Sequence, residues 1–108
     1  SAVMLSGETA VGKYPIETVR LMKSTIIEAE KDFDYEDFFY NDAARQVFND
    51  ISSSVALAAV KTAYSAHGKA LVALTTSGFT ARIMARFRPR MPIIAVTPNE
   101  NTYHQLAF

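Results

Sequence analysis

The sequence predicts an α/β fold, in which parallel strands alternate with helices. Two short, continuous apolar segments support this class, residues 70–74 (ALVAL) and 92–96 (PIIAV). Continuous apolar strands are typical of a sheet that is covered on both faces. The segment between them carries apolar residues at helical spacing, so the order strand, helix, strand predicts a right-handed, parallel βαβ unit.

The composition is that of an ordinary globular protein. The chain has 108 residues, 49% of them hydrophobic, with 11 basic and 11 acidic side chains and a formal net charge of zero. A neutral balance argues against a nucleic-acid partner, and no apolar segment is long enough to cross a membrane, so neither partner is expected. The absence of cysteine excludes disulfides and thiolate metal sites.

The charges are unevenly distributed along the chain. Residues 28–50 contain eight acids and two bases, whereas residues 69–99 contain five bases and no acid. The acidic segment is interpreted as a solvated loop. The basic segment is more suggestive, because a positive region without acids can hold an anion.

The first half of the chain predicts a short strand end at residues 2–5, a loop, and a helix at residues 15–31. Pro15 fits the first position of that helix, which is amphipathic and needs a partner on one side. Residues 32–49 mix aromatic and acidic side chains and are interpreted as a linker whose aromatics dock on a neighbouring domain. A domain boundary is expected there.

The second half begins with the clearest helical pattern, at residues 51–67. Asp50 or Ser52 is expected to cap its start, and Gly68 occupies the place of a left-handed cap at its end. Two apolar stripes on this helix predict burial on two sides. A shorter helix is expected between the two strands, and residues 101–108 begin another.

The strongest candidate site lies between the first strand and the following helix. Three of its residues are expected to act directly: Ser77 and Thr80 could donate hydroxyl hydrogen bonds to a phosphate, and Gly78 lets the backbone approach closely. Arg82, one turn into the helix, could add charge. Ordinary helix capping explains the same residue types equally well. The complete candidate set is Thr75, Thr76, Ser77, Gly78, Phe79 and Thr80.

A second candidate is the loop that contains Ser6 and Glu8. It follows a predicted strand, where catalytic loops lie in α/β folds, so Ser6 could supply a hydroxyl contact and Glu8 an acid or ligand. A structural turn with a buried, hydrogen-bonded Glu8 is the favoured alternative. Neither loop carries a metal-binding pattern, so no metal ligand is predicted in this chain.

Two motifs resemble the pyruvate kinase family. Residues 3–19, VMLSGETAVGKYPIETV, closely resemble the segment that closes the family's (β/α)8 barrel, and residues 70–106 resemble the opening of its C-terminal domain. The resemblance implies three parts. These are the tail of the catalytic barrel domain, with its last strand and helix, at 1–31, a linker at 32–49, and an incomplete, Rossmann-like, three-layer α/β regulatory domain at 50–108.

The resemblance also implies an activity for the parent enzyme, which is cytoplasmic and glycolytic. Such an enzyme transfers the phosphoryl group of phosphoenolpyruvate to ADP, giving pyruvate and ATP, with Mg²⁺ and K⁺ as cofactors. Most of the groups that this needs are absent from the chain, so the isolated chain is expected to be inactive. Of the family's active-site residues, only Ser6 maps onto this sequence, at the mouth of the barrel, with Glu8 as its neighbour.

The resemblance assigns residues 75–80 to the family's effector loop, which in regulated members holds a phosphate of fructose 1,6-bisphosphate or another sugar phosphate. Some members have basic residues in this loop where the present chain has Thr76 and Phe79, so weaker anion binding is expected. Val11 likewise replaces a lysine of many members. The parent is expected to be a homo-oligomer, usually a tetramer. The alternatives to an enzyme part are a non-catalytic sugar-phosphate-binding module and an oligomerisation segment.

Overall fold

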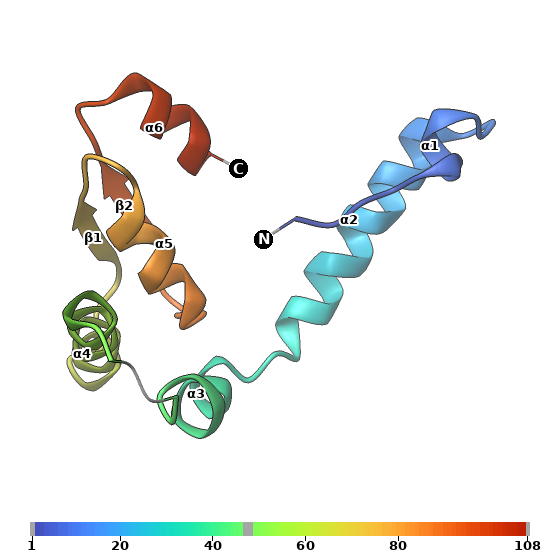
Figure 1. Ribbon diagram of the computed structural model, residues 1–108. Helices are drawn as coiled ribbons and strands as arrows, with labels where there is room; N and C mark the ends of the chain where they lie inside the picture. The colour runs from blue at the N-terminus through green and yellow to red at the C-terminus, as the bar shows by residue number, and fades with distance from the viewer. Residues whose placement is uncertain (1, 47–48, 108) are drawn as a thin grey trace. The chain divides into compact units, whose positions relative to one another are not determined.

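The chain forms two compact units, which a computed structural model describes over residues 2–46 and 49–107. The first unit is Ser1–Phe33 and the second is Asp34–Phe108 (Figure 1). No helix in the described ranges is long and apolar enough to cross a membrane.

The first unit consists of two helices, α1 (Gly7–Ala10) and α2 (Pro15–Lys31). The predicted helix at residues 15–31 is confirmed to the residue, with Pro15 at its start, where a missing N–H costs nothing. Neither helix has a buried residue, and Leu21 of α2 is 70% exposed. Within the first unit, the apolar face of α2 is therefore not covered.

The strand predicted at residues 2–5 is wrong. These residues lie in no strand, and β1 and β2 of the second unit form the sheet of the described chain. A strand exists only when a neighbour accepts and donates its backbone hydrogen bonds. An apolar segment without such a neighbour stays extended but unpaired.

The segment predicted as a linker contains two short helical elements of the second unit. They are α3 (Tyr35–Asp37) and the π-helical η1 (Phe38–Ala43). Phe39 is completely buried, with its ring centroid 5.2 Å from that of Tyr64 and 6.1 Å from that of Phe87. Phe39 thus belongs to the core of the second unit, and Phe38 packs against that core. The assignment of 1–31, 32–49 and 50–108 to domains of a larger enzyme stays a prediction.

Helix α4 (Ile51–Ser65) begins where the sequence predicts. The Asp50 carboxylate accepts a 2.7 Å hydrogen bond from the Ser53 N–H, which confirms Asp50 as the cap. The prediction that Gly68 adopts the left-handed conformation is wrong. His67 does so instead, with φ 52°.

The end of α4 explains this one-residue shift. The Gly68 N–H donates to the Ala63 carbonyl at 2.8 Å, and the His67 N–H donates to the Tyr64 carbonyl at 3.1 Å. This pair of bonds is the Schellman motif, whose left-handed residue comes directly before the residue that makes the longer-range bond. Gly68 is the residue that makes the longer-range bond, so it contributes its N–H to the motif and does not need a positive φ.

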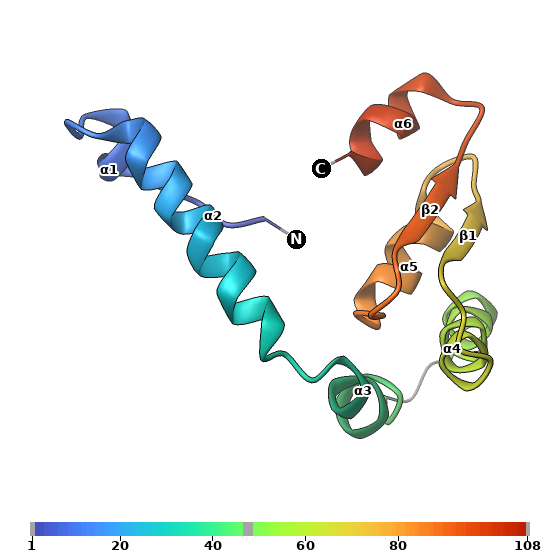
Figure 2. The ribbon, with the colours of Figure 1, turned by 180° about the vertical axis from the view of Figure 1, so that it is seen from behind.

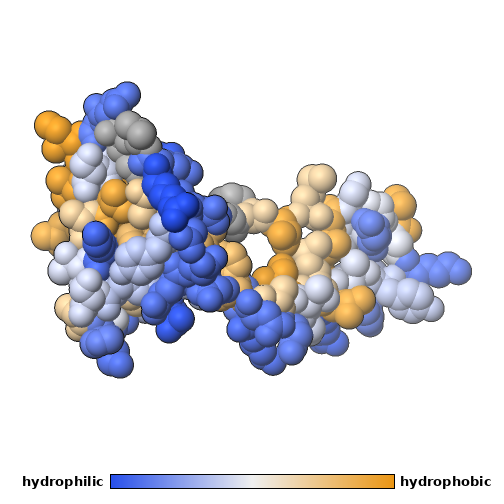
Figure 3. All heavy atoms as spheres, turned by 90° about the horizontal axis from the view of Figure 1, so that it is seen from below, coloured by the Kyte–Doolittle hydropathy of each residue, from blue (hydrophilic) through white to orange (hydrophobic). Residues whose placement is uncertain are grey.

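Burial of α4 is one-sided, so the prediction of burial on two sides is wrong. The buried residues are Ser53, Ala56, Val60 and Ala63. The predicted stripe that contains Ile51 and Val55 is exposed, with Ile51 at 83% and Val55 at 60%. Figure 3 shows apolar side chains at the surface of the second unit.

The predicted order strand, helix, strand and the parallel pairing of the two strands are confirmed. Strands β1 (Leu71–Leu74) and β2 (Ile93–Val96) are parallel, with Leu71 opposite Ile93, and helix α5 (Phe79–Arg86) connects them. The chain therefore has an α/β fold with parallel strands and flanking helices.

The sheet is covered on one face. Helix α5 lies against that face, and Figure 2 looks onto the opposite one. There Val72 is 62% and Leu74 is 78% exposed, although both strands are continuously apolar in sequence. In the described part of the chain, the third layer of the prediction is therefore not seen.

The last element is α6 (Glu100–Leu106), close to the predicted 101–108. The Asn99 side chain caps it by accepting a 3.1 Å hydrogen bond from the Thr102 N–H. The core of the second unit is assembled from η1, α4, β1, α5 and the residue after α5. Its members are Phe39, Ala43, Ala56, Val60, Ala63, Leu71, Ala73, Ala81, Ile83, Met84 and Phe87.

Candidate functional site

The candidate pair Ser6 and Glu8 lies at the start of α1, and both side chains are exposed. The Ser6 N–H donates a 3.0 Å hydrogen bond to Glu8 Oε2. Bonds from the backbone N–H groups of Glu8 and Ser6 hold the pKa of the Glu8 carboxyl below its ordinary value. Glu8 is therefore an ionised, hydrogen-bonded turn residue. The expectation that such a residue would be buried is wrong, because the turn lies on the surface of the first unit.

The hydroxyl of Ser6 makes no hydrogen bond within the described residues, whereas its carbonyl is occupied. That carbonyl accepts a 3.2 Å bond from the Thr9 hydroxyl and a 3.0 Å bond from the Ala10 N–H. The Ser6 backbone is thus fixed by α1, while its side chain stays available to a ligand.

The strongest candidate from the sequence, the loop Thr75–Thr80, joins the carboxyl end of β1 to the start of α5. The Thr75 N–H donates a 2.9 Å hydrogen bond to the Val96 carbonyl, which extends the strand pairing into the loop. The Thr75 hydroxyl oxygen then accepts a 2.9 Å bond from the Gly78 N–H. This bond closes a tight turn, and Gly78 leaves it in the left-handed conformation, with φ 77°.

Capping by Ser or Thr does not explain this loop. The N-cap of α5 is Gly78, which has no side chain to offer, and no side-chain cap bond is made there. The described structure thus shows no Ser or Thr cap on α5, although the Thr75 hydroxyl has a structural role in the turn. The role of the loop in holding a phosphate is still a prediction.

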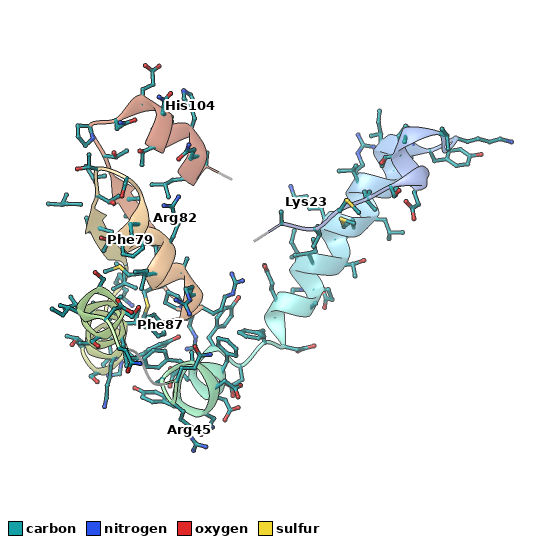
Figure 4. The ribbon with its side chains drawn as sticks, in the orientation of Figure 1. Lys23, Arg45, Phe79, Arg82, Phe87 and His104 are labelled. Carbon is teal, nitrogen blue, oxygen red and sulfur yellow. The ribbon has the colours of Figure 1, made fainter. Side chains whose placement is uncertain are left out.

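The loop offers several polar groups to a ligand. Thr76, Ser77 and Thr80 are exposed, Gly78 is buried, and the Phe79 side chain is 51% exposed. Figure 4 shows Phe79 and Arg82 on the first turns of α5. Thr80 and Arg82 therefore lie in the first turns of α5, and Ser77 lies in the loop just before its N-cap, Gly78.

Backbone donors accompany these side chains. Within the described residues, four N–H groups of the loop and the first turn of α5 donate no hydrogen bond. They are that of Ser77 in the loop and those of Phe79, Thr80 and Ala81 in α5. The first turn of any helix leaves such groups without intrahelical partners, and the helix dipole adds partial positive charge there. Uncommitted N–H groups and hydroxyls are the donors that phosphate oxygens accept.

The basic segment that follows the loop does not form one positive surface. Arg90 lies 3.7 Å from the Glu36 carboxylate, and Arg86 lies close enough to Asp50 to help lower the pKa of that carboxyl. The acidic and basic segments therefore partly neutralise each other. Arg82 is the base nearest in sequence to the loop.

Three residues that the sequence analysis did not assign to the site contact the loop. The hydroxyls of Thr97 and Thr102 donate to the Thr76 carbonyl, and Leu106 packs on Gly78. Thr97 could have been found, because parallel strands end at the same edge of a sheet and Thr97 directly follows β2. The other two lie on α6, whose orientation no sequence pattern gives.

No metal centre is assembled in the part of the chain that the structure describes. It contains no cluster of three or more His, Asp or Glu side chains that could hold an ion. No chemical step is therefore assigned to a metal within these residues.

The fold and the loop define the class of protein. A parallel sheet with a polar loop at the carboxyl ends of its strands is the arrangement in which open α/β proteins bind ligands.

Comparisons identify the family within this class. Residues 53–108 match the family model described as "Pyruvate kinase, alpha/beta domain". The chain belongs to the pyruvate kinase family.

Relatives of known name match almost the whole chain. A pyruvate kinase of Chlamydia muridarum is 46% identical over 99% of this chain, and one of Staphylococcus epidermidis is 42% identical over 98%. The crystal structure of Cryptosporidium parvum pyruvate kinase matches 96% of the chain with a TM-score of 0.84 at 31% identity. The chain spans only 23%, 18% and 22% of the lengths of these three proteins.

Proposed function

We propose that this chain is part of a pyruvate kinase, an enzyme that transfers the phosphoryl group of phosphoenolpyruvate to ADP. The observation that carries this proposal is the 46% identity to the Chlamydia muridarum pyruvate kinase over 99% of the chain. Mg²⁺ and K⁺, a cytoplasmic location and a tetrameric assembly belong to the same proposal for the whole enzyme. The chain itself contributes a hydroxyl near the substrate and a regulatory loop.

A segment exchange tests the enzymatic part. These 108 residues replace the matching segment of the Chlamydia muridarum enzyme, and pyruvate formation is measured with phosphoenolpyruvate and ADP. The folded chimera is expected to be active, and the isolated chain inactive. A folded but inactive chimera would contradict the proposal, as would turnover by the isolated chain above a no-enzyme control.

Ser6 is proposed to contact the substrate through its hydroxyl. The support is its exposed, uncommitted side chain on a backbone that α1 fixes. In the chimera, Ser6→Ala should lower kcat. Ser24→Ala, which removes an exposed α2 hydroxyl bonded to the Arg20 carbonyl at 3.0 Å, should not. Equal activities of the two variants would remove Ser6 from the site.

The loop Thr75–Thr80 is proposed to bind a phosphate group of a sugar-phosphate effector. Its uncommitted N–H groups and the Ser77 and Thr80 hydroxyls support this assignment, and its lack of a lysine or arginine predicts weak binding. Calorimetric titrations with fructose 1,6-bisphosphate, ribose 5-phosphate and inorganic phosphate test it.

The loop variant for these titrations is Ser77→Ala with Thr80→Ala. Its control is Ser54→Ala with Ser65→Ala, which removes two α4 hydroxyls that bond only to carbonyls of their own helix region. Saturable binding that the loop variant alone loses supports the assignment. Unchanged affinity in the loop variant refutes it.

A second candidate function is that of a contact between copies. The exposed Ile51 and Val55 on one side of α4 favour it, because exposed apolar side chains at helical spacing gain free energy from a partner. The double change Ile51→Lys with Val55→Lys should shift the mass measured by light scattering toward the monomer. A mass unaffected by these changes would exclude this face.

A further inference from the structure

Helix α6 contacts the loop on both sides of Ser77. One contact is a hydrogen bond from the Thr102 hydroxyl to the Thr76 carbonyl, at 2.8 Å, between residues 26 positions apart in the sequence. The other is the packing of Leu106 against Gly78, so close that a Cβ at Gly78 would lie 2.9 Å from Leu106 Cδ2.

Thr102 is well fixed for this contact. Its side chain is 6% exposed, and its own N–H donates to Asn99 Oδ1 at 3.1 Å as part of the α6 cap. The Thr97 hydroxyl makes a second, longer approach to the same carbonyl, at 3.5 Å. Thr97 also accepts a 3.2 Å bond from the Asn99 N–H. The Thr76 carbonyl is thus oriented by a small network of three polar side chains.

Orienting the Thr76 carbonyl also orients the next backbone donor. A peptide unit is planar and trans, so the carbonyl of Thr76 and the N–H of Ser77 point in opposite directions. Because the carbonyl faces Thr102, the Ser77 N–H faces away from it. That N–H has no acceptor within the described residues, and it belongs to the donors assigned above to a phosphate.

We infer that Thr102 is a positioning residue for the loop Thr75–Thr80, and that α6 sets the direction of the Ser77 N–H through Thr102 and Leu106. The part of this inference that concerns phosphate affinity rests on the proposed function of the loop. The part that concerns loop geometry does not, because it follows from the two contacts alone.

The test compares Thr102→Val, which keeps the shape and removes the hydroxyl, with Thr102→Ser, which keeps the hydroxyl. Backbone NMR of the 108-residue chain should show a large shift of the Ser77 amide resonance in the valine variant, and its return in the serine variant. Thr25→Val is the control, since it removes a hydroxyl that bonds only to the Leu21 carbonyl of α2.

Titration with inorganic phosphate is the second readout. Losing the oriented donor should weaken binding about three- to tenfold in the valine variant, with recovery in the serine variant. Leu106→Ala is an independent variant from the same helix, expected to shift the Gly78 amide. It keeps the inference open to refutation if the valine variant does not fold.

The outcomes separate the two proposals. Unchanged Ser77 and Gly78 amide resonances in the folded valine and alanine variants would overturn the positioning role. Shifted resonances in a chain that binds no phosphate would support that role and contradict the proposed function of the loop. Shifted resonances with unaltered phosphate affinity would overturn the affinity part of the inference.

Discussion

Replacing Phe39 with Ala should destabilise the second unit by about 4 kcal/mol. Phe39 is 0% exposed, so the change removes a fully buried ring and leaves a cavity, for which Phe→Ala substitutions cost about 3–5 kcal/mol. Its ring pairs with those of Tyr64 and Phe87, and such pairs contribute about 0.5–1.5 kcal/mol beyond area burial. Because of these ring contacts, we expect the loss of unfolding free energy to lie in the middle of that range of about 3–5 kcal/mol or above it.

This loss is comparable with the whole stability of the unit. A unit spanning residues 34–108 is expected to have an unfolding free energy of about 4–11 kcal/mol, from 0.05–0.15 kcal/mol per residue. Phe39→Leu, which costs less, therefore accompanies the alanine variant. Amide hydrogen exchange of the β1 residues, resolved by NMR, measures the unfolding free energy of this unit separately from that of the first.

The control is Tyr103→Ala, which removes a 66% exposed ring of the same unit and should change the unfolding free energy by about 0.5 kcal/mol or less. A loss below about 1 kcal/mol for Phe39→Ala would refute the reasoning. It would mean that residues 34–43 form a linker outside the core, as their acidic composition first indicated.

Three further changes test the local geometry. Asp50→Asn should lower the stability of the second unit most above pH 3.8 and progressively less below it. The Ser53 N–H lowers the pKa of folded Asp50, so the stabilisation by the ionised carboxylate is lost when it is protonated. Melting temperatures of both proteins at pH 7 and pH 3 measure this, and a pH-independent difference between them would contradict it. His67→Gly should raise the unfolding free energy, measured by urea denaturation, by about 0.5–1 kcal/mol, because glycine adopts a φ of 52° without strain. The control, Ala66→Gly at an ordinary φ, should lower the unfolding free energy. Gly78→Ala should lower the melting temperature by several degrees, because its φ is 77° and its Cβ would press on α6; an unchanged melting temperature would show that the loop has another conformation.

Much of the second unit followed from local patterns. The two strands and α5 could be predicted because apolar continuity and helical spacing act over a few residues. The start of α4 could be predicted because a cap needs only Asp50 and the amide three residues later. In each case, the information lies within a single element.

The errors came where a residue's state depends on something distant or on a one-residue shift. Phe39 is buried against the rings of Tyr64 and Phe87, which lie far away in the sequence. No pattern within residues 32–49 predicts these contacts. The left-handed residue after α4 is His67, because a hydrogen bond to Ala63 selects the position. Composition alone favoured the neighbouring glycine.

The candidate site divides in the same way. The loop Thr75–Thr80 was visible in the sequence because its hydroxyls and glycine are consecutive, whereas the residues that hold its backbone lie on α6. The exposure of Ile51 and Val55 on α4 was not predicted, because an apolar stripe in a sequence does not show whether a partner covers it.

The uncovered face of the sheet has a consequence for how the chain behaves at high concentration. Val72, Leu74, Ile94 and Val96 present aliphatic carbon to water, at exposures from 49% to 78%. A formal net charge of zero at pH 7 provides no long-range repulsion to keep such faces apart. Colloidal self-attraction should therefore be strongest near neutral pH and weaken as either acid or base gives every molecule the same sign of charge.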